Sequence, residues 1–143
     1  MTDQIVELRT QEEFKEAYPV MKELRIQLDE ALYLDLLSEM VGRRGYRLFA
    51  LRHEGKIVAL AGVEAAVDLF YGRYIWLDDL VVSASTPASY GEQIVQFVEN
   101  FARSEGFKTV ATASGLWRPD VHSFYEEHLG FERRGYVFRK ELK

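Results

Sequence analysis

The sequence predicts an α/β (α+β) fold, a mixed and mostly antiparallel sheet with helices on both faces. Three observations predict it. Apolar residues recur at helical spacing in the first third of the chain and alternate from Tyr46 onward. Gly-containing turns separate the alternating runs, and a later amphipathic helix stands between two further strands. With 143 residues, residues 1–143 are predicted to form a single domain.

The N-terminal part reads as one strand followed by two helices. Ile5–Leu8 is the strand, and Thr10 with Glu13 forms a capping box that begins the first helix. Pro19 lies within that helix and is predicted to kink or divide it, because proline removes a backbone donor. The second helix begins at Asp29. Its buried face is predicted to hold Leu32, Leu36 and Met40.

The middle of the chain reads as three antiparallel strands. Tyr46–His53 and Lys56–Phe70 flank the turn Glu54-Gly55, and a further turn leads into Tyr74–Val82. After a loop, the apolar residues between Ile94 and Ala102 follow the spacing of an amphipathic helix. Lys108–Ala113 is then a strand, which the crossover helix should place parallel to Tyr74–Val82.

The C-terminal part is predicted to contain a short helix and a final strand. Pro119 suits the first position of the helix, and Gly130 ends it. Residues Phe131–Leu142 are predicted to be a strand, bent or broken near Gly135. The element order is therefore β, α, α, β, β, β, α, β, α, β.

Composition excludes several classes of function. The chain has no cysteine, which excludes disulfides, Cys-ligated zinc and a thiol nucleophile. The net charge of −5 and the lack of a basic run argue against a nucleic-acid partner. No apolar run reaches membrane-spanning length and no signal peptide is seen, so we expect no membrane partner and a cytoplasmic location. The three histidines show no metal spacing, so no metal is expected.

Four short motifs carry the chemical information. They are Asp78–Val82, Ser89-Tyr90-Gly91, the stretch from Ser114 to Arg118, and Leu129-Gly130-Phe131 after Tyr125. Together with the element order, these motifs resemble the GNAT superfamily of N-acetyltransferases over nearly the whole chain. The resemblance implies direct transfer of an acetyl group from acetyl-CoA to a primary amine of a small-molecule or peptide acceptor.

The resemblance also implies an acyl-donor site. A helix N-terminus suits a pyrophosphate, because its free N–H groups and its dipole attract anions. The turn of the family reads Q/R-x-x-G-x-G/A, whereas here it reads Thr86-Pro87-Ala88-Ser89-Tyr90-Gly91, with only the final glycine kept. The residues that the resemblance assigns to the acyl donor are Leu80, Val81, Val82, Thr86, Ala88, Ser89, Tyr90, Gly91, Ser114 and Arg118.

The altered turn leaves a second interpretation open. Ser89 and Glu92 have the spacing of a capping box of their own. The chain could then be a non-catalytic domain of the same fold that holds a metabolite or a partner protein.

Three residues are candidates for proton transfer. The resemblance implies that Tyr125 protonates the departing thiolate. An amine acceptor must lose a proton before it attacks, and carboxylates on strands can take it. Asp79 matches the acidic position of the family and Glu64 lies on the neighbouring strand. Asp78 and Asp79 are expected on opposite faces of the sheet, since adjacent strand residues alternate. The sequence leaves the acceptor and the oligomeric state open, including a homodimer.

Overall fold

A computed structural model describes residues 3–115 and 119–143 and confirms the mixed α/β fold. It divides into two compact units, Met1–Thr112 and Ala113–Lys143, and each is described by itself. The elements in chain order are β1 Asp3–Leu8, α1 Gln11–Leu24, α2 Glu30–Arg44, β2 Arg47–His53, β3 Lys56–Asp68, β4 Gly72–Val82, α3 Ser89–Ser104, β5 Val110–Thr112, α4 Pro119–Ser123 and the π-helical turn η1 Phe124–His128. The assignment of residues 1–143 to one domain stays a prediction.

The sheet of the first unit has the strand order β1-β2-β3-β4-β5. The first three pairings are antiparallel, and β4 pairs with β5 in parallel, as predicted. Glu54 and Gly55 both have positive φ, at 51° and 81°, which is the geometry of a two-residue hairpin turn that matches the strand twist. Local turn chemistry and the crossover helix therefore determine the sheet order.

The two N-terminal helices begin where the sequence predicts. Thr10 and Glu13 form the reciprocal capping box of α1, and α1 continues as one helix through Pro19. Asp29 caps α2 by accepting from the backbone N–H of Leu32 at 2.8 Å. Gly45 ends α2 in the left-handed region with φ of 68°, where a side chain would be strained.

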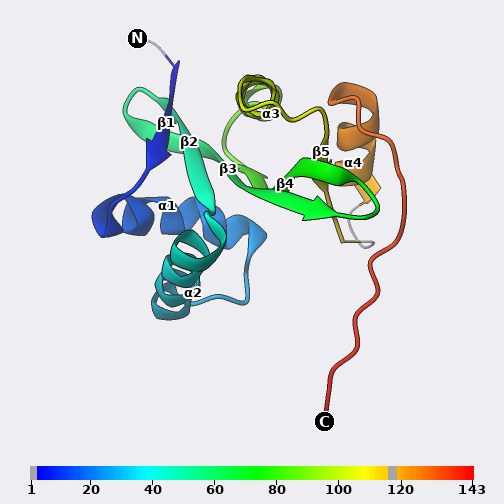
Figure 1. Cartoon of the computed structure of the whole chain (residues 1–143). Coiled ribbons are helices and arrows are strands. Elements are labelled where there is room, and N and C mark those ends of the chain that lie inside the picture. Colours follow the sequence, from blue (N-terminus) through cyan, green and yellow to red (C-terminus); the bar gives the residue numbers. More distant parts are fainter. Residues whose placement is uncertain (1–2, 116–118) are drawn as a thin grey trace. The chain divides into compact units, whose positions relative to one another are not determined.

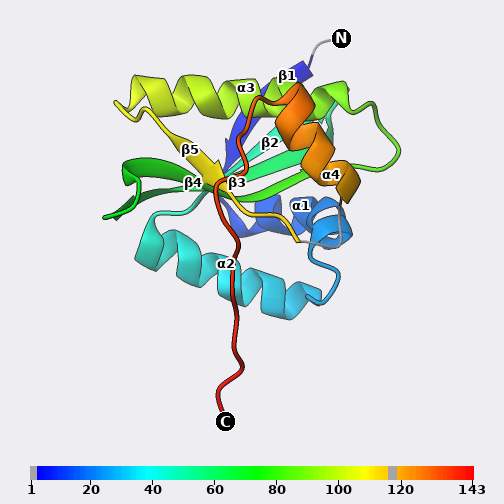
Figure 2. The same cartoon turned by 90° about the vertical axis from the view of Figure 1, so that its right-hand side faces the viewer.

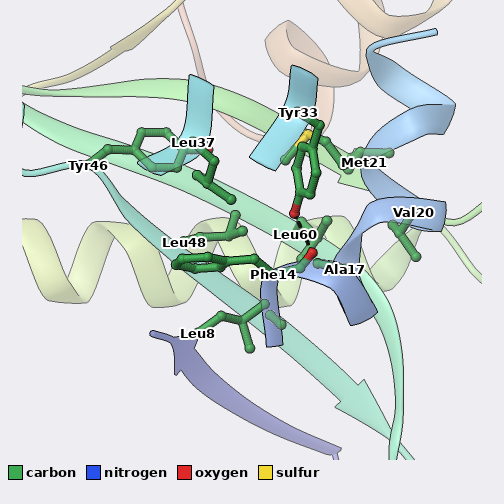
Figure 3. Packing of buried hydrophobic residues seen from close by; sticks show 12 residues of the cluster. Leu8, Phe14, Ala17, Val20, Met21, Tyr33, Leu37, Tyr46, Leu48 and Leu60 are labelled. Carbon is green, nitrogen blue, oxygen red and sulfur yellow. Dashed lines mark hydrogen bonds between the residues drawn. The ribbon is translucent and has the colours of Figure 1, made fainter. Parts of the chain in front are cut away.

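The buried face of α2 differs from the prediction. Leu32 and Leu36 are exposed, at 44% and 41%, and Tyr33 and Leu37 are buried instead. Figure 3 shows why an aromatic residue with a hydroxyl is accepted here: the Tyr33 hydroxyl donates to the backbone carbonyl of Phe14 at 2.7 Å. The polar end of Tyr33 is satisfied, so the ring can be buried between α1 and α2.

Helices cover both faces of the sheet in the first unit (Figures 1 and 2). Residues from α1 and α2 pack with Leu48, Leu60 and Val81 on one face. Residues from α3 pack with Leu51 and Leu77, among others, on the opposite face. The two apolar clusters follow the alternation expected of strands that are buried on both sides.

The predicted final strand is wrong. Residues 131–143 have no helix or strand in the structure, and Tyr136, Val137 and Phe138 are exposed. A strand exists only when its backbone groups pair with another strand. The second unit, as far as it is described, contains no strand with which this segment could pair.

The described residues contain no helix that is both long enough and apolar enough to cross a membrane.

Tyr46 approaches β3 so closely that a side chain at Gly62 would clash with it. A Cβ atom at Gly62 would overlap the hydroxyl end of Tyr46, whereas a Cβ at Gly42 in α2 meets nothing within 4 Å. Tyr46 is only 3% exposed and its hydroxyl is hydrogen bonded, so the ring cannot move aside without breaking buried contacts.

We therefore predict opposite effects for two Gly-to-Ala exchanges. Gly62→Ala should lower the free energy of unfolding by about 2–4 kcal/mol, because it overpacks the sheet and displaces Tyr46. Gly42→Ala should raise it by about 0.5–1 kcal/mol, because alanine favours the helix and the site is open. Urea unfolding followed by circular dichroism measures both. Equal effects of the two exchanges would contradict this account.

Candidate active site

A β-bulge in β4 organises the polar groups of the first unit. Gly62 of β3 pairs with Asp79, and the next residue, Val63, pairs with Leu77, so Asp78 has no partner across the ladder. The extra residue reverses the alternation of β4. Leu77 faces α3, whereas the carboxylates of Asp78 and Asp79 both contact arginines that come from α1 and α2. The expectation that these two acids lie on opposite faces is therefore wrong.

Asp79 is a buried carboxylate with two donors. The Tyr46 hydroxyl donates to Oδ2 at 2.6 Å, and the Arg25 Nε donates to Oδ1 at 2.9 Å. Arg25 also donates through Nη2 to the backbone carbonyl of Asp78 at 2.8 Å. Burial of Tyr46 and the charge of Asp79 raise the pKa of the Tyr46 hydroxyl well above its usual value, so it remains a donor. Asp79 thus ties β4 to β2 and to the end of α1.

The carboxyl groups of Asp78 and Glu64 form a pair that contacts the guanidinium of Arg44. Arg44 holds Glu64 by two hydrogen bonds, with Nε at 3.1 Å from Oε1 and Nη2 on Oε2. The contact of Arg44 Nη2 with Asp78 Oδ1 is longer, at 3.4 Å. Glu64 and Asp78 side chains are 12% and 14% exposed, and Arg44 is 50% exposed. The guanidinium therefore lies between the two acids and solvent.

The two acids of this carboxyl pair, Asp78 and Glu64, differ in protonation. Burial, the hydrogen bond with Glu64 and the charge of Glu64 raise the pKa of Asp78 to about 8. Burial would also raise the pKa of Glu64, but hydrogen bonds from Arg44 and Asp78 outweigh it and lower that pKa. Asp78 Oδ2 is buried and has no other donor among the described residues. With its pKa raised to about 8, Asp78 keeps a proton at neutral pH, and its hydrogen bond with Glu64 then joins a neutral acid to a carboxylate.

Among the described residues of the first unit, no strand pairs with the edge of β4 beyond the bulge on the β5 side. Ile75–Leu77 pair with Val110–Thr112, where β5 ends, and Leu80–Val82 pair only with β3 within the first unit. Thr112 Oγ1 closes the parallel ladder by donating to the Leu77 carbonyl at 2.8 Å. Backbone N–H groups of this unpaired edge could stabilise an oxyanion.

The turn before α3 differs from the predicted cap. Ala88 is the residue before the helix, Ser89 is its first residue, and no side chain caps this end. The predicted capping box of Ser89 and Glu92 is therefore wrong, because Ser89 lies one position too far along the chain to cap. Thr86 folds back on the Ser83 carbonyl through its N–H at 3.0 Å and its hydroxyl at 2.7 Å. Tyr90 N donates to the Pro87 carbonyl at 3.2 Å, so the N–H groups of Ala88 and Ser89 are those left for a ligand or solvent at this helix end.

Tyr90 and Gly91 differ in burial from their neighbours in this turn. Both are buried, whereas Ala88 and Ser89 are exposed. The Tyr90 ring lies 5.7 Å from the ring of His53, and so only its backbone belongs to the turn. Gly91 N donates to the Ala88 carbonyl at 2.9 Å.

The second unit carries the remaining predicted residues. Tyr125 lies in η1, its ring is 5.4 Å from the Phe131 ring, and its carbonyl accepts from Phe131 N at 3.0 Å. His122 Nε2 donates to the Gly115 carbonyl at 2.7 Å, which fixes its tautomer. Ser114 precedes this helix, and Arg118 lies outside the described residues. π-Helical turns are rare and are frequent at functional sites.

The sequence did not indicate Arg44 or Tyr46 as site residues. Their contacts with the acids span 20 positions of sequence from Arg44 to Glu64 and 33 from Tyr46 to Asp79, and no local pattern marks such a contact. Arg25 likewise binds Asp79 from a distant part of the sequence, while Tyr33 is in the core. Among the described residues no group of three potential ligands could hold a metal ion. The expectation that none is needed stays a prediction.

Residues 5–131 match the model of the acetyltransferase (GNAT) family. The chain belongs to this family and is an acetyltransferase enzyme.

One relative in sequence supports the same assignment, and two solved structures share the fold. The chain is 38% identical over 137 residues to the uncharacterized N-acetyltransferase YhdJ of Bacillus subtilis (strain 168), which covers 95% of this chain and 96% of the relative. The aminoglycoside N-acetyltransferase AAC(6')-Iy, solved in complex with CoA, matches with a TM-score of 0.82 at 16% identity over 99% of this chain and 96% of that chain. A transcriptional regulator from Bacillus halodurans C-125 matches with a TM-score of 0.80 at 18% identity over 99% and 100%. The two structures share the fold.

The raised pKa of Asp78 predicts how stability depends on pH. The folded protein keeps a proton that the unfolded chain releases above about pH 4. The free energy of unfolding should therefore fall as pH rises from about 4 to about 8, by up to about 1.4 kcal/mol per pH unit.

Asp78→Asn isolates this effect, because the amide imitates the protonated acid and cannot titrate. Urea unfolding of both proteins is measured between about pH 5 and 8.5, roughly the titration range of the buried acid. The free energy of unfolding should fall less steeply with pH in the variant than in the parent. The histidines contribute equally to both proteins and cancel in the difference. Parallel curves would show that Asp78 is ionised throughout this range.

Proposed function

We propose that the chain transfers an acetyl group from acetyl-CoA directly to a primary amine of a small-molecule or peptide acceptor in the cytoplasm. The observation that carries the proposal is the unpaired edge of β4, which lies directly beside a carboxyl pair that is protonated near neutral pH. The N–H groups of the unpaired edge suit the carbonyl oxygen of a thioester, and the carboxyl pair suits an amine that must lose a proton. Family membership supports acetyl transfer, and the CoA bound to AAC(6')-Iy supports the donor.

The acyl donor is proposed to lie along the β4 edge and the α3 N-terminus. Backbone N–H groups of Leu80–Val82 would stabilise the oxyanion. Those of Ala88 and Ser89 would hold the pyrophosphate, because the N–H groups of Thr86, Tyr90 and Gly91 are already donated within the turn. Pro87 offers no N–H and Glu92 adds an unfavourable charge, so binding depends on the helix dipole and on Ser89. Ser114 and Arg118 are proposed as further contacts, as the family resemblance implies.

The proton acceptor is proposed to be the carboxyl pair of Asp78 and Glu64. Both oxygens of Asp79 already accept hydrogen bonds, Oδ1 from Arg25 and Oδ2 from Tyr46, so Asp79 is not the proposed proton acceptor. Asp78 in its ionised form takes a proton from the ammonium group of the acceptor, and the neutral amine then attacks the thioester carbon. The nitrogen–carbon bond forms and the carbon–sulfur bond breaks. The second amine proton leaves to solvent, and Tyr125 is proposed to protonate the thiolate.

A cationic acceptor fits the charges of this carboxyl pair. Arg44 is half exposed and lies over Glu64 and Asp78, where an ammonium group would also be stabilised. AAC(6')-Iy, by its name, acts on aminoglycosides, which are amines. These observations support an amine acceptor for this chain.

The alternative is a non-catalytic domain of the same fold that binds a metabolite or a protein. The altered phosphate turn favours it, because only the last glycine of the family pattern is kept.

Two measurements decide between the alternatives. Titration with acetyl-CoA in a calorimeter should give a Kd in the micromolar range, about −7 to −8 kcal/mol. Thiol release from acetyl-CoA should then be stimulated by at least one amine in a panel of polyamines, aminoglycosides and peptides, with the acetylated product identified by mass spectrometry. No binding at about 1 mM acetyl-CoA would overturn the enzyme proposal.

Isosteric exchanges should separate the two proton-transfer groups. Asp78→Asn should lower kcat/KM by about a hundredfold or more and remove the rise of the rate toward pH 8, because the base is lost. Tyr125→Phe should lower kcat by a similar factor and keep that rise. Asp35→Asn and Tyr136→Phe are exposed controls and should behave as the parent does. Parental rates in either proton-transfer variant would refute the role given to that residue.

A further inference from the structure

The last turn of α1 contacts β4 on both sides of Leu80–Val82. Glu23 accepts from Ala84 N through Oε1 at 2.8 Å and from the Ser83 hydroxyl through Oε2 at 3.1 Å. Arg25, two residues later, binds the bulge at the other end of the same segment. One helix terminus therefore holds both ends of the unpaired edge.

This edge needs a support that the sheet does not provide. The ladder to β3 ends where Ser83 N donates to the Val58 carbonyl at 2.8 Å. Beyond it, the bonds of Thr86 return to Ser83 and stay within the loop. Among the described residues, Glu23 supplies the hydrogen bonds that tie the loop to α1, next to the single backbone bond from Ser83 to β3. The loop leads directly into α3 at Ser89.

The position of Glu23 is unfavourable for the helix itself. A carboxylate in the last turn faces the negative end of the helix dipole, which destabilises this end of the helix. Its two hydrogen bonds to the loop outweigh this cost, since bonds to a charged acceptor are the stronger ones. Glu23 thus serves the loop and not α1.

We propose that Glu23 is a positioning residue for the acyl donor: it fixes the loop from Ser83 to Ala88, and with it the N-terminus of α3, at the distance from the β4 edge that coenzyme A requires. The inference rests on the proposed use of acetyl-CoA. Arg25 positions the acceptor side in the same way, because it binds the carbonyl of Asp78 and the carboxylate of Asp79. The end of α1 therefore joins the acyl-donor side to the acceptor side.

The test compares two substitutions of Glu23. Glu23→Ala removes both hydrogen bonds and should raise the KM and the Kd for acetyl-CoA about fivefold, with kcat within about twofold and the KM of the amine unchanged. Glu23→Gln can accept from Ala84 N and donate to the Ser83 hydroxyl, so it should restore the parental constants. Glu12→Ala, an exposed change in the first turn of the same helix, is the matched control.

Hydrogen exchange gives a readout that needs no ligand. The amide of Ala84 should exchange faster in Glu23→Ala than in the parent, while amides in the middle of β3 remain protected. A parent that binds no acetyl-CoA would remove the proposed function but leave this exchange difference in place. An unchanged KM for acetyl-CoA in Glu23→Ala, or unchanged exchange at Ala84, would overturn the positioning role.

Discussion

The buried carboxylate of Asp79 is the constraint on which the rest of the first unit depends. A carboxylate that is 8% exposed must have donors, and it finds them in Tyr46, just before β2, and in Arg25, at the end of α1. The Tyr46 hydroxyl reaches Asp79 only because Gly62 leaves room in β3. Three elements that are distant in sequence are therefore held at one point of β4. Loss of one donor would leave an uncompensated charge in the interior, which costs more than an ordinary hydrogen bond.

The same constraint produces the site. With Asp79 drawn toward α1 and α2, β4 must take up an extra residue, and Asp78 becomes that residue. Asp78 then lies beside Glu64 without a cation of its own, since Arg44 is hydrogen bonded mainly to Glu64. Two adjacent aspartates thus have different environments. Asp79 is held by a cation and a phenol, whereas burial and a neighbouring acid keep a proton on Asp78 near neutral pH.

Local signals in the sequence predicted the parts of the fold that local interactions decide. The capping box of Thr10, the cap at Asp29 and the turn at Glu54-Gly55 each involve residues within four positions of one another. The predictions that were wrong concern choices made by distant partners. Leu32 and Tyr33 both suit a buried helix face, and the carbonyl of Phe14 decides between them. A bulge depends on two strands at once, so the sequence of β4 alone could not show that Asp78 and Asp79 share a face. The alternation after Phe131 indicates a strand but cannot supply its partner.

Charge balance links the candidate base to its substrate. The cluster holds three acids, Glu64, Asp78 and Asp79, and two arginines, Arg25 and Arg44. Arg25 pairs with Asp79, and Arg44 is shared between Glu64 and Asp78 with its closer contacts to Glu64, so Asp78 is the acid whose ionisation is least compensated. In the proposed reaction the ammonium group of the acceptor supplies it. A cation within a few ångströms favours the ionised carboxylate, so the acceptor itself lowers the pKa of the group that must deprotonate it. The base would then become competent when an amine is bound, and a neutral ligand of the same shape would leave Asp78 protonated.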